Sequence, residues 1–161
     1  MTTAIIGTGG IGSAIGRQLA SGGEALRLSS ADKQSAQRLA AAIGGTAVVA
    51  VDNRSALQGA DAVILALRFS VLKDVIDEIA DALGDKSLVV PSNPVGLDAQ
   101  RKVVRLLPER QSSGETIAGW LPTGAHFNYR VWHHVGRPLR VLEQTVTRAS
   151  GSVLRDRRRP W

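Results

Sequence analysis

The sequence of 161 residues contains no cysteine, which excludes disulfides, thiolate zinc sites and cysteine nucleophiles. No apolar run approaches the ~20 residues that a membrane-spanning helix needs. At the N-terminus, no basic leader precedes a hydrophobic stretch. We therefore expect a soluble, cytoplasmic protein with no membrane partner. Apolar residues make up 43% of the chain and charged residues 21%, so we expect a packed domain rather than disorder.

Charge is distributed unevenly along the chain. Residues 1–127 contain 12 basic and 12 acidic residues, whereas residues 128–161 contain eight arginines and only two acidic residues. The net charge of +6 and the pI near 10.7 therefore come from the C-terminal segment. We expect a neutral domain over residues 1–127 and an Arg-rich tail over residues 128–161.

Short apolar runs alternate with helical patterns over the first ninety residues, which is typical of a parallel α/β sheet. The expected strands are 3–6, 24–28, 46–51, 62–67 and 87–90, and the expected helices are 10–19, 32–43, 54–58, 71–83 and 114–121. Right-handed crossovers then predict a doubly wound sheet with strand order 3-2-1-4-5. Two prolines and a glycine mark residues 91–98 as a loop.

A glycine motif follows the first strand and opens the first helix: Gly7-Thr8-Gly9-Gly10-Ile11-Gly12. It fits G-x-G-x-x-G, in which the first glycine permits a tight turn and the second lets a pyrophosphate approach the backbone. The third lets helix and strand pack closely. The helix N-terminus adds free N–H groups and partial positive charge. This context predicts a Rossmann-like domain that binds a dinucleotide; the alternative is such a domain that has lost its ligand.

The end of the second strand favours NADP(H) over NAD. NAD-binding chains usually carry an acidic residue there, whereas this chain has Ser29 and Ser30, followed closely by Lys33. Two hydroxyls and an ammonium group suit a 2′-phosphate through hydrogen bonds and charge. Asp32, twenty residues after Gly12, keeps NAD open. We favour the other role for Asp32, as the N-cap of the second helix.

Four segments together resemble a known family: GTGGIGSAIGRQLA, SSADK, GADAVILAL and PSNPVG. They are similar to the NADPH-dependent F420 reductases, whose domain is similar to the N-terminal domain of pyrroline-5-carboxylate reductase. The resemblance covers about residues 1–127. It implies that the chain holds NADP(H) at the sheet edge and transfers a hydride between NADPH and a deazaflavin, coenzyme F420.

The resemblance also implies roles for individual residues in holding the phosphates. Gly7 to Gly12 would hold the pyrophosphate, and Ser29 and Ser30 would face the 2′-phosphate. The family often places arginines where this chain has Ser30 and Ala31, and a proline at position 68. Arg68 is thus a candidate for the missing positive charge, the alternative being a solvated residue at a strand end.

Two further segments match the family at the sugar and the nicotinamide. Leu67, Arg68 and Phe69 would run beneath the adenosine and ribose. Asn93 and Pro94 would border the nicotinamide, although an asparagine before a proline is also a common turn-former.

No catalytic residue is assigned, because hydride transfer needs two rings stacked at close range and little acid–base help. His126 is the titratable candidate in the matched region, and we favour a structural role for it. No metal site is expected.

The tail departs from the family after about His126 and Phe127. Family members add there a sixth strand, further helix–strand units and a segment that helps enclose the second substrate. A slip of the reading frame is one explanation. Helix faces left bare by the missing strands predict an exposed apolar patch and a homodimer.

Nucleic-acid binding is a further interpretation of the Arg-rich tail over residues 128–161, with weaker support from the sequence. Its candidates are four arginines for phosphates and three aromatic residues for stacking on bases: Arg155, Arg157, Arg158, Arg159, Tyr129, Trp132 and Trp161. The tail has no recognition motif, and a run of charge is usually solvated. We therefore expect small-molecule cofactors and no nucleic acid as partners.

Three functions remain open. The first is an NADPH-dependent oxidoreductase of the F420 reductase type. The second is a non-catalytic dinucleotide-binding module or an inactive truncated fragment, which the divergent C-terminal segment favours. The third is an NADPH-dependent reductase of a small imine, although the dimerising helical domain of pyrroline-5-carboxylate reductase has no counterpart in 161 residues.

Overall fold

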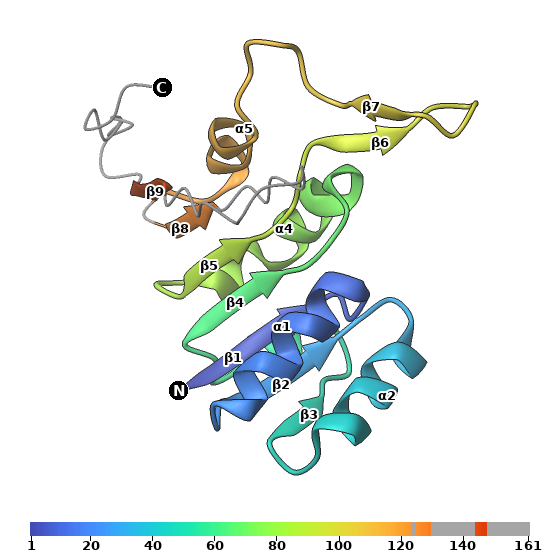
Figure 1. The fold of residues 1–161 in the computed structure, drawn as a ribbon. Helices are drawn as coiled ribbons and strands as arrows, with labels where there is room; N and C mark the ends of the chain where they lie inside the picture. Colours follow the sequence, from blue (N-terminus) through green and yellow to red (C-terminus); the bar gives the residue numbers. More distant parts are fainter. Residues whose placement is uncertain (124, 130–143, 148–161) are drawn as a thin grey trace.

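The computed structural model describes residues 1–123, 125–129 and 144–147. A seven-stranded sheet lies between two layers of helices (Figure 1). Its strands are β1 (Thr2–Ile6), β2 (Ala25–Ser29), β3 (Ala47–Val49), β4 (Ala62–Leu65), β5 (Ser87–Val90), β8 (His126–Tyr129) and β9 (Gln144–Thr147). The order β3-β2-β1-β4-β5-β8-β9 confirms the predicted 3-2-1-4-5 and extends it by two strands. All neighbouring strands are parallel except β8 and β9, which are antiparallel.

Helices cover both faces of the sheet, which explains why its central strands are continuous apolar runs. The helices are α1 (Gly10–Ser21), α2 (Lys33–Ile43), α3 (Asn53–Ala56), α4 (Phe69–Leu83) and α5 (Ser113–Trp120). Helices α1 and α2 pack on the face that contains Ile5, and α3, α4 and α5 on the face that contains Ile6. Successive strand residues point to opposite faces, so β1 contributes a fully buried isoleucine to each of the two cores.

Two helix starts refine the predictions. The Asp32 side chain accepts a hydrogen bond from the Gln34 backbone N–H at 3.0 Å, which confirms Asp32 as the N-cap of α2. Helix α4 begins at Phe69, two residues before the predicted start, with Arg68 as its N-cap. The strand before it is correspondingly shorter, because β4 ends at Leu65.

The prediction of a loop over residues 91–98 is wrong for part of that segment. Residues Val95–Leu97 form β6, which pairs antiparallel with β7 (Val103–Arg105) in a hairpin that extends from the body of the protein (Figure 1). The turn between them is closed by Asp98, whose Oδ1 accepts hydrogen bonds from the N–H groups of Gln100 and Lys102 at 2.9 and 2.8 Å. A strand of three residues is too short to show a recognisable alternation of apolar and polar residues. The neighbouring prolines therefore led to the prediction of a loop.

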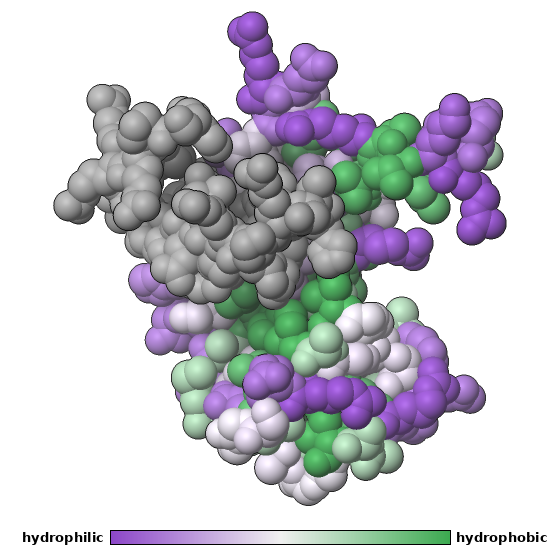
Figure 2. Space-filling model, in the orientation of Figure 1, coloured by the Kyte–Doolittle hydropathy of each residue, from purple (hydrophilic) through white to green (hydrophobic). Residues whose placement is uncertain are grey.

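Exposed apolar side chains gather on this hairpin (Figure 2). Val95, Leu97 and Val103 are 47%, 62% and 72% exposed. The register places Leu97 opposite Val103, so these two side chains share one face. These exposed apolar side chains belong to a hairpin, whereas the sequence predicted an exposed apolar patch on helix faces, and that patch stays a prediction.

The C-terminal segment is described only in part. Strand β9 lies within residues 128–161, where no strand was predicted. The interpretation of the tail as a nucleic-acid contact concerns residues outside the described ones, including Trp132, Trp161 and the arginines from Arg155 to Arg159. Over the described residues, no helix combines the length and apolar character needed to cross a membrane.

Candidate dinucleotide-binding site

The candidate site lies at the edge of the sheet where the parallel strands end. Ile6 at the end of β1 is in register with Ser29 of β2 and with Leu65 of β4. The segments that follow these three strands therefore start side by side. From β1 the chain proceeds to β2 on one side, whereas β4 continues to β5 on the other. Ligands of doubly wound sheets bind at this point of reversal, outside the carboxyl ends of the strands.

Gly7 and Gly12 are required by the protein's own packing. Gly7 has a φ of +96°, and a Cβ there would lie 2.5 Å from the carbonyl oxygen of Ala66. A Cβ at Gly12 would lie 1.9 Å from the carbonyl oxygen of Gly7. Both contacts are with backbone, which cannot rotate away. These two glycines let the loop fold back tightly between β1 and β4.

Gly9 and Gly10 are not required by the packing. Apart from the adjoining backbone, no heavy atom of the described residues lies within 4 Å of a Cβ built at either glycine. Gly9 is the N-cap of α1, with a φ of −69°, and among the described residues no side chain caps the helix there. The first-turn N–H groups of a helix have no partners within the helix and carry partial positive charge. An uncapped helix start with bare backbone on its open side is a surface that a pyrophosphate fits.

Two serine hydroxyls hold the loop in place. The Thr8 carbonyl oxygen accepts hydrogen bonds from Ser13 Oγ on α1 at 2.7 Å and from Ser35 Oγ on α2 at 3.0 Å. Thr8 Oγ1 in turn donates to Ser35 Oγ at 2.8 Å. Thr8 is only 3% exposed, so its side chain supports the loop from inside rather than facing a ligand. Neither Ser13 nor Ser35 belongs to the site residues predicted from the sequence, since both lie outside the glycine motif.

The end of β2 divides the predicted 2′-phosphate residues into two groups. Ser29 is buried, and its hydroxyl donates to Asn53 Oδ1 at 2.7 Å. Asn53 Nδ2 donates in turn to Glu78 Oε2 at 2.9 Å, so the hydroxyl of Ser29 is engaged within the protein. Ser30 is half-buried and Lys33 is exposed. Ser30 and Lys33 are therefore the residues of this group that are accessible at the sheet edge.

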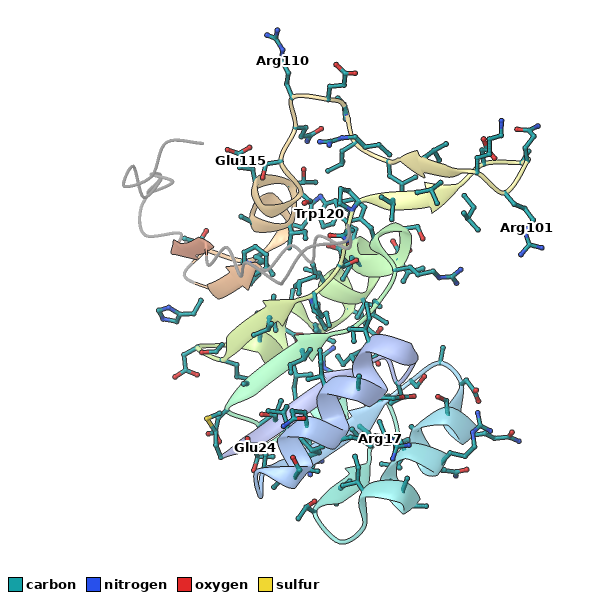
Figure 3. The ribbon with its side chains drawn as sticks, in the orientation of Figure 1. Arg17, Glu24, Arg101, Arg110, Glu115 and Trp120 are labelled. Carbon is teal, nitrogen blue, oxygen red and sulfur yellow. The ribbon has the colours of Figure 1, made fainter. Side chains whose placement is uncertain are left out.

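The segment after β4 lies beside the glycine loop. Leu67 is half-buried against Gly7, since a Cβ on that glycine would lie 2.9 Å from Leu67 Cδ2. Arg68 is exposed at the start of α4. Phe69 is 7% exposed, and its ring packs against that of Trp120 on α5 with centroids 5.5 Å apart. Figure 3 labels Trp120 on the inner side of α5. Phe69 thus offers a ligand its backbone rather than its ring.

Asn93 and Pro94 follow β5 at the same edge, and both are half-buried. The Val95 N–H donates to the Asn93 carbonyl oxygen at 2.8 Å, which makes a tight turn before the hairpin. His126 lies at the opposite edge, because it begins β8 in register with Ser87, the first residue of β5. Its side chain is exposed there, away from the candidate site. Within the described ranges, no three His, Asp or Glu side chains come together to hold a metal ion.

The arrangement suits an anionic dinucleotide. It combines backbone N–H groups at a helix start, an accessible hydroxyl at Ser30, and the cationic side chains of Lys33 and Arg68. Hydrogen bonds from such donors to phosphate are charge-assisted and about twice as strong as neutral ones.

Comparison with known proteins supports this assignment. Residues 2–94 match the family described as NADP oxidoreductase, coenzyme F420-dependent. A search of curated proteins finds no match. The predicted likeness to pyrroline-5-carboxylate reductase stays a prediction.

Solved structures share the fold. A protein from Arthrobacter sp. FB24, whose description proposes an F420-dependent NADP reductase, is 20% identical with a TM-score of 0.70 over 80% of this chain and 61% of its own. A hypothetical protein from Sinorhizobium meliloti is 26% identical, with a TM-score of 0.64 over 81% of this chain and 60% of its own. The imine reductase from Myxococcus stipitatus, solved with NADP+, is 19% identical, with a TM-score of 0.60 over 81% of this chain and 40% of its own. This chain therefore spans less than two thirds of the length of each of these proteins.

Proposed function

The chain belongs to the family of coenzyme F420-dependent NADP oxidoreductases, and we propose that it binds NADP(H) and supports hydride transfer between NADPH and the deazaflavin F420. The observation that carries the proposal is the bare backbone at Gly9 and Gly10 beside the uncapped start of α1. Glycine is unnecessary for packing at these two positions, but it is necessary for a ligand that must touch the backbone.

The pyrophosphate is assigned to the loop from Gly7 to Gly12. The first N–H groups of α1 donate to its oxygens, and the helix dipole favours its charge. Thr8, braced by Ser13 and Ser35, fixes the loop before the ligand arrives. Pre-organisation of this kind lowers the entropy that binding must overcome.

The 2′-phosphate is assigned to Ser30 and Lys33, with Arg68 as a further cation at the same edge. Lys33→Ala is expected to weaken NADPH binding about tenfold, because an exposed lysine lies at the lower end of the about 1.5–3 kcal/mol that a hydrogen bond to a charged group contributes. NADH binding, which involves no 2′-phosphate, is expected to change little. The control is Lys102→Ala at the hairpin, which should leave both affinities unchanged. Equal losses for the two cofactors with Lys33→Ala would contradict the assignment.

The nicotinamide is assigned to Asn93 and Pro94 after β5. When both cofactors are bound, the nicotinamide and the deazaflavin supply the hydride chemistry. The chain's part is to hold the two rings in contact and to exclude water between them. The tight turn from Asn93 to Val95 fixes this wall of the site without an acid or a base.

The proposed activity is tested by following NADPH oxidation by the full chain with F420 and, separately, with a cyclic imine. Oxidation that depends on F420 supports the proposal. Oxidation that depends only on the imine would replace it with the imine reductase alternative. Saturable NADPH binding without turnover of either acceptor would indicate a non-catalytic dinucleotide-binding module.

A further inference from the structure

Ser35 joins two parts of the site that come from different segments of the chain. Its hydroxyl accepts from Thr8 Oγ1 at 2.8 Å and donates to the Thr8 carbonyl oxygen at 3.0 Å. Thr8 belongs to the glycine loop after β1, whereas Ser35 lies in the first turn of α2 after β2. Both hydrogen bonds are partly buried, because Thr8 is buried and Ser35 is half-buried.

Ser13 offers a comparison built into the same loop. Its hydroxyl donates to the same Thr8 carbonyl oxygen, at 2.7 Å. However, Ser13 lies on α1, the helix that the glycine loop itself opens. Ser13 therefore braces the loop from within its own segment, whereas Ser35 ties the loop to α2. Lys33 precedes Ser35 by two residues at the start of that helix.

We propose that Ser35 is a positioning residue that sets the place of the 2′-phosphate site relative to the pyrophosphate loop, and thereby the preference for NADPH over NADH. The inference rests on the proposed function. NADPH must satisfy the glycine loop and the start of α2 at once, so it gains from a fixed spacing between them. NADH lacks the 2′-phosphate and engages the loop without needing that spacing.

The test is calorimetric titration of the full chain with NADPH and with NADH at fixed ionic strength, using wild type and three variants. For Ser35→Ala we expect about a tenfold loss of NADPH affinity and about a threefold loss of NADH affinity, so the preference falls about threefold. Ser13→Ala is expected to weaken both cofactors by the same factor. Ser21→Ala, which removes an exposed hydroxyl bonded to the Gln18 carbonyl oxygen on α1, should change neither affinity.

Two further variants separate positioning from folding. Ser35→Thr keeps the hydroxyl and is expected to restore the wild-type preference. Thr8→Val removes the donor to Ser35 from the loop side, so it should lower the preference even if Ser35→Ala fails to fold. Thermal melting shows which variants are folded.

Equal losses for both cofactors with Ser35→Ala, or with Thr8→Val where Ser35→Ala does not fold, would overturn the inference while leaving NADP(H) binding intact. A wild-type chain that binds neither nucleotide would overturn the proposed function and the inference with it.

Discussion

Replacing Gly9 with alanine separates cofactor binding from folding. Apart from the adjoining backbone, no atom in the part of the chain that the structure describes lies within 4 Å of the position that the new methyl group would take, and the φ of −69° suits an alanine. Gly12 provides the contrast, since its methyl group would lie 1.9 Å from the carbonyl oxygen of Gly7. We expect Gly9→Ala to fold without NADPH binding of wild-type strength, and Gly12→Ala to lose the fold.

The size of each effect follows from the geometry at Gly9. Alanine is a poorer N-cap than glycine by up to about 1 kcal/mol, and the smaller entropy of its unfolded chain offsets about 0.4–1 kcal/mol of that cost. The free energy of unfolding should therefore stay within about 1 kcal/mol of wild type. A methyl group that keeps a pyrophosphate from the backbone removes at least one hydrogen bond to a charged group, worth about 1.5–3 kcal/mol. NADPH affinity should then fall about 10- to 150-fold.

Urea unfolding followed by circular dichroism measures the stability of Gly9→Ala, and calorimetric titration measures its affinity for NADPH. The control is Gly119→Ala on α5, where an added Cβ likewise meets no atom of the described residues within 4 Å beyond the adjoining backbone. It should keep wild-type affinity and gain up to about 1 kcal/mol of stability from helix propensity. Wild-type NADPH affinity in Gly9→Ala would refute the reasoning, because the cofactor would then not touch this backbone.

Other predictions concern stability. Arg27 donates to the carbonyl oxygens of Ser55 and Ala56, at 2.9 and 3.2 Å, so Arg27→Met should lower the free energy of unfolding by about 1–3 kcal/mol in urea titrations; an unchanged midpoint would contradict this. The pKa of Asp52 lies below its ordinary value of 3.8, chiefly because the carboxylate accepts a hydrogen bond from the backbone N–H of Ser55. The Asp52 carboxylate therefore stabilises the fold above its unfolded pKa, and this stabilisation is lost as the pH falls through its folded pKa. The difference in urea midpoint between wild type and Asp52→Ala should shrink over that pH range. A difference that does not depend on pH would contradict this role of the Asp52 carboxylate. Arg101 has a φ of +61° at the hairpin turn, a conformation that glycine adopts more readily than a residue with a side chain. Arg101→Gly should therefore raise the free energy of unfolding by about 0.5–1 kcal/mol. A lower free energy of unfolding would show instead that the Arg101 side chain stabilises the fold.

The sheet could be predicted from the sequence because its signals are local. Strands buried on both faces carry continuous apolar runs, as in β4 and in the last three residues of β1, and the glycine loop marks where the first strand turns into a helix. The hairpin of β6 and β7 was missed because its strands are short and its turn depends on the Asp98 side chain. Figure 3 shows Arg101 at the tip of this hairpin and Arg110 on the loop beyond it, both pointing away from the body.

Side-chain directions at the site could not be predicted, because they depend on contacts between distant segments. Ser29 was expected to face a phosphate, yet its hydroxyl bonds to Asn53, 24 residues away. Thr8 and Ser35 are 27 residues apart and meet only because β1 and β2 are neighbours. Phe69 is drawn into the core by Trp120, a residue of α5. In each case the partner of the side chain lies on another element, and the spacing of residues along the sequence gives no signal of such a contact.

The central claim, that the carboxyl edge of this sheet binds NADP(H), is tested most directly by calorimetric titration of the full chain with NADPH and then with NADH at one ionic strength. The account predicts saturable binding of both nucleotides, tighter for NADPH. A folded chain that binds neither NADPH nor NADH would contradict this claim.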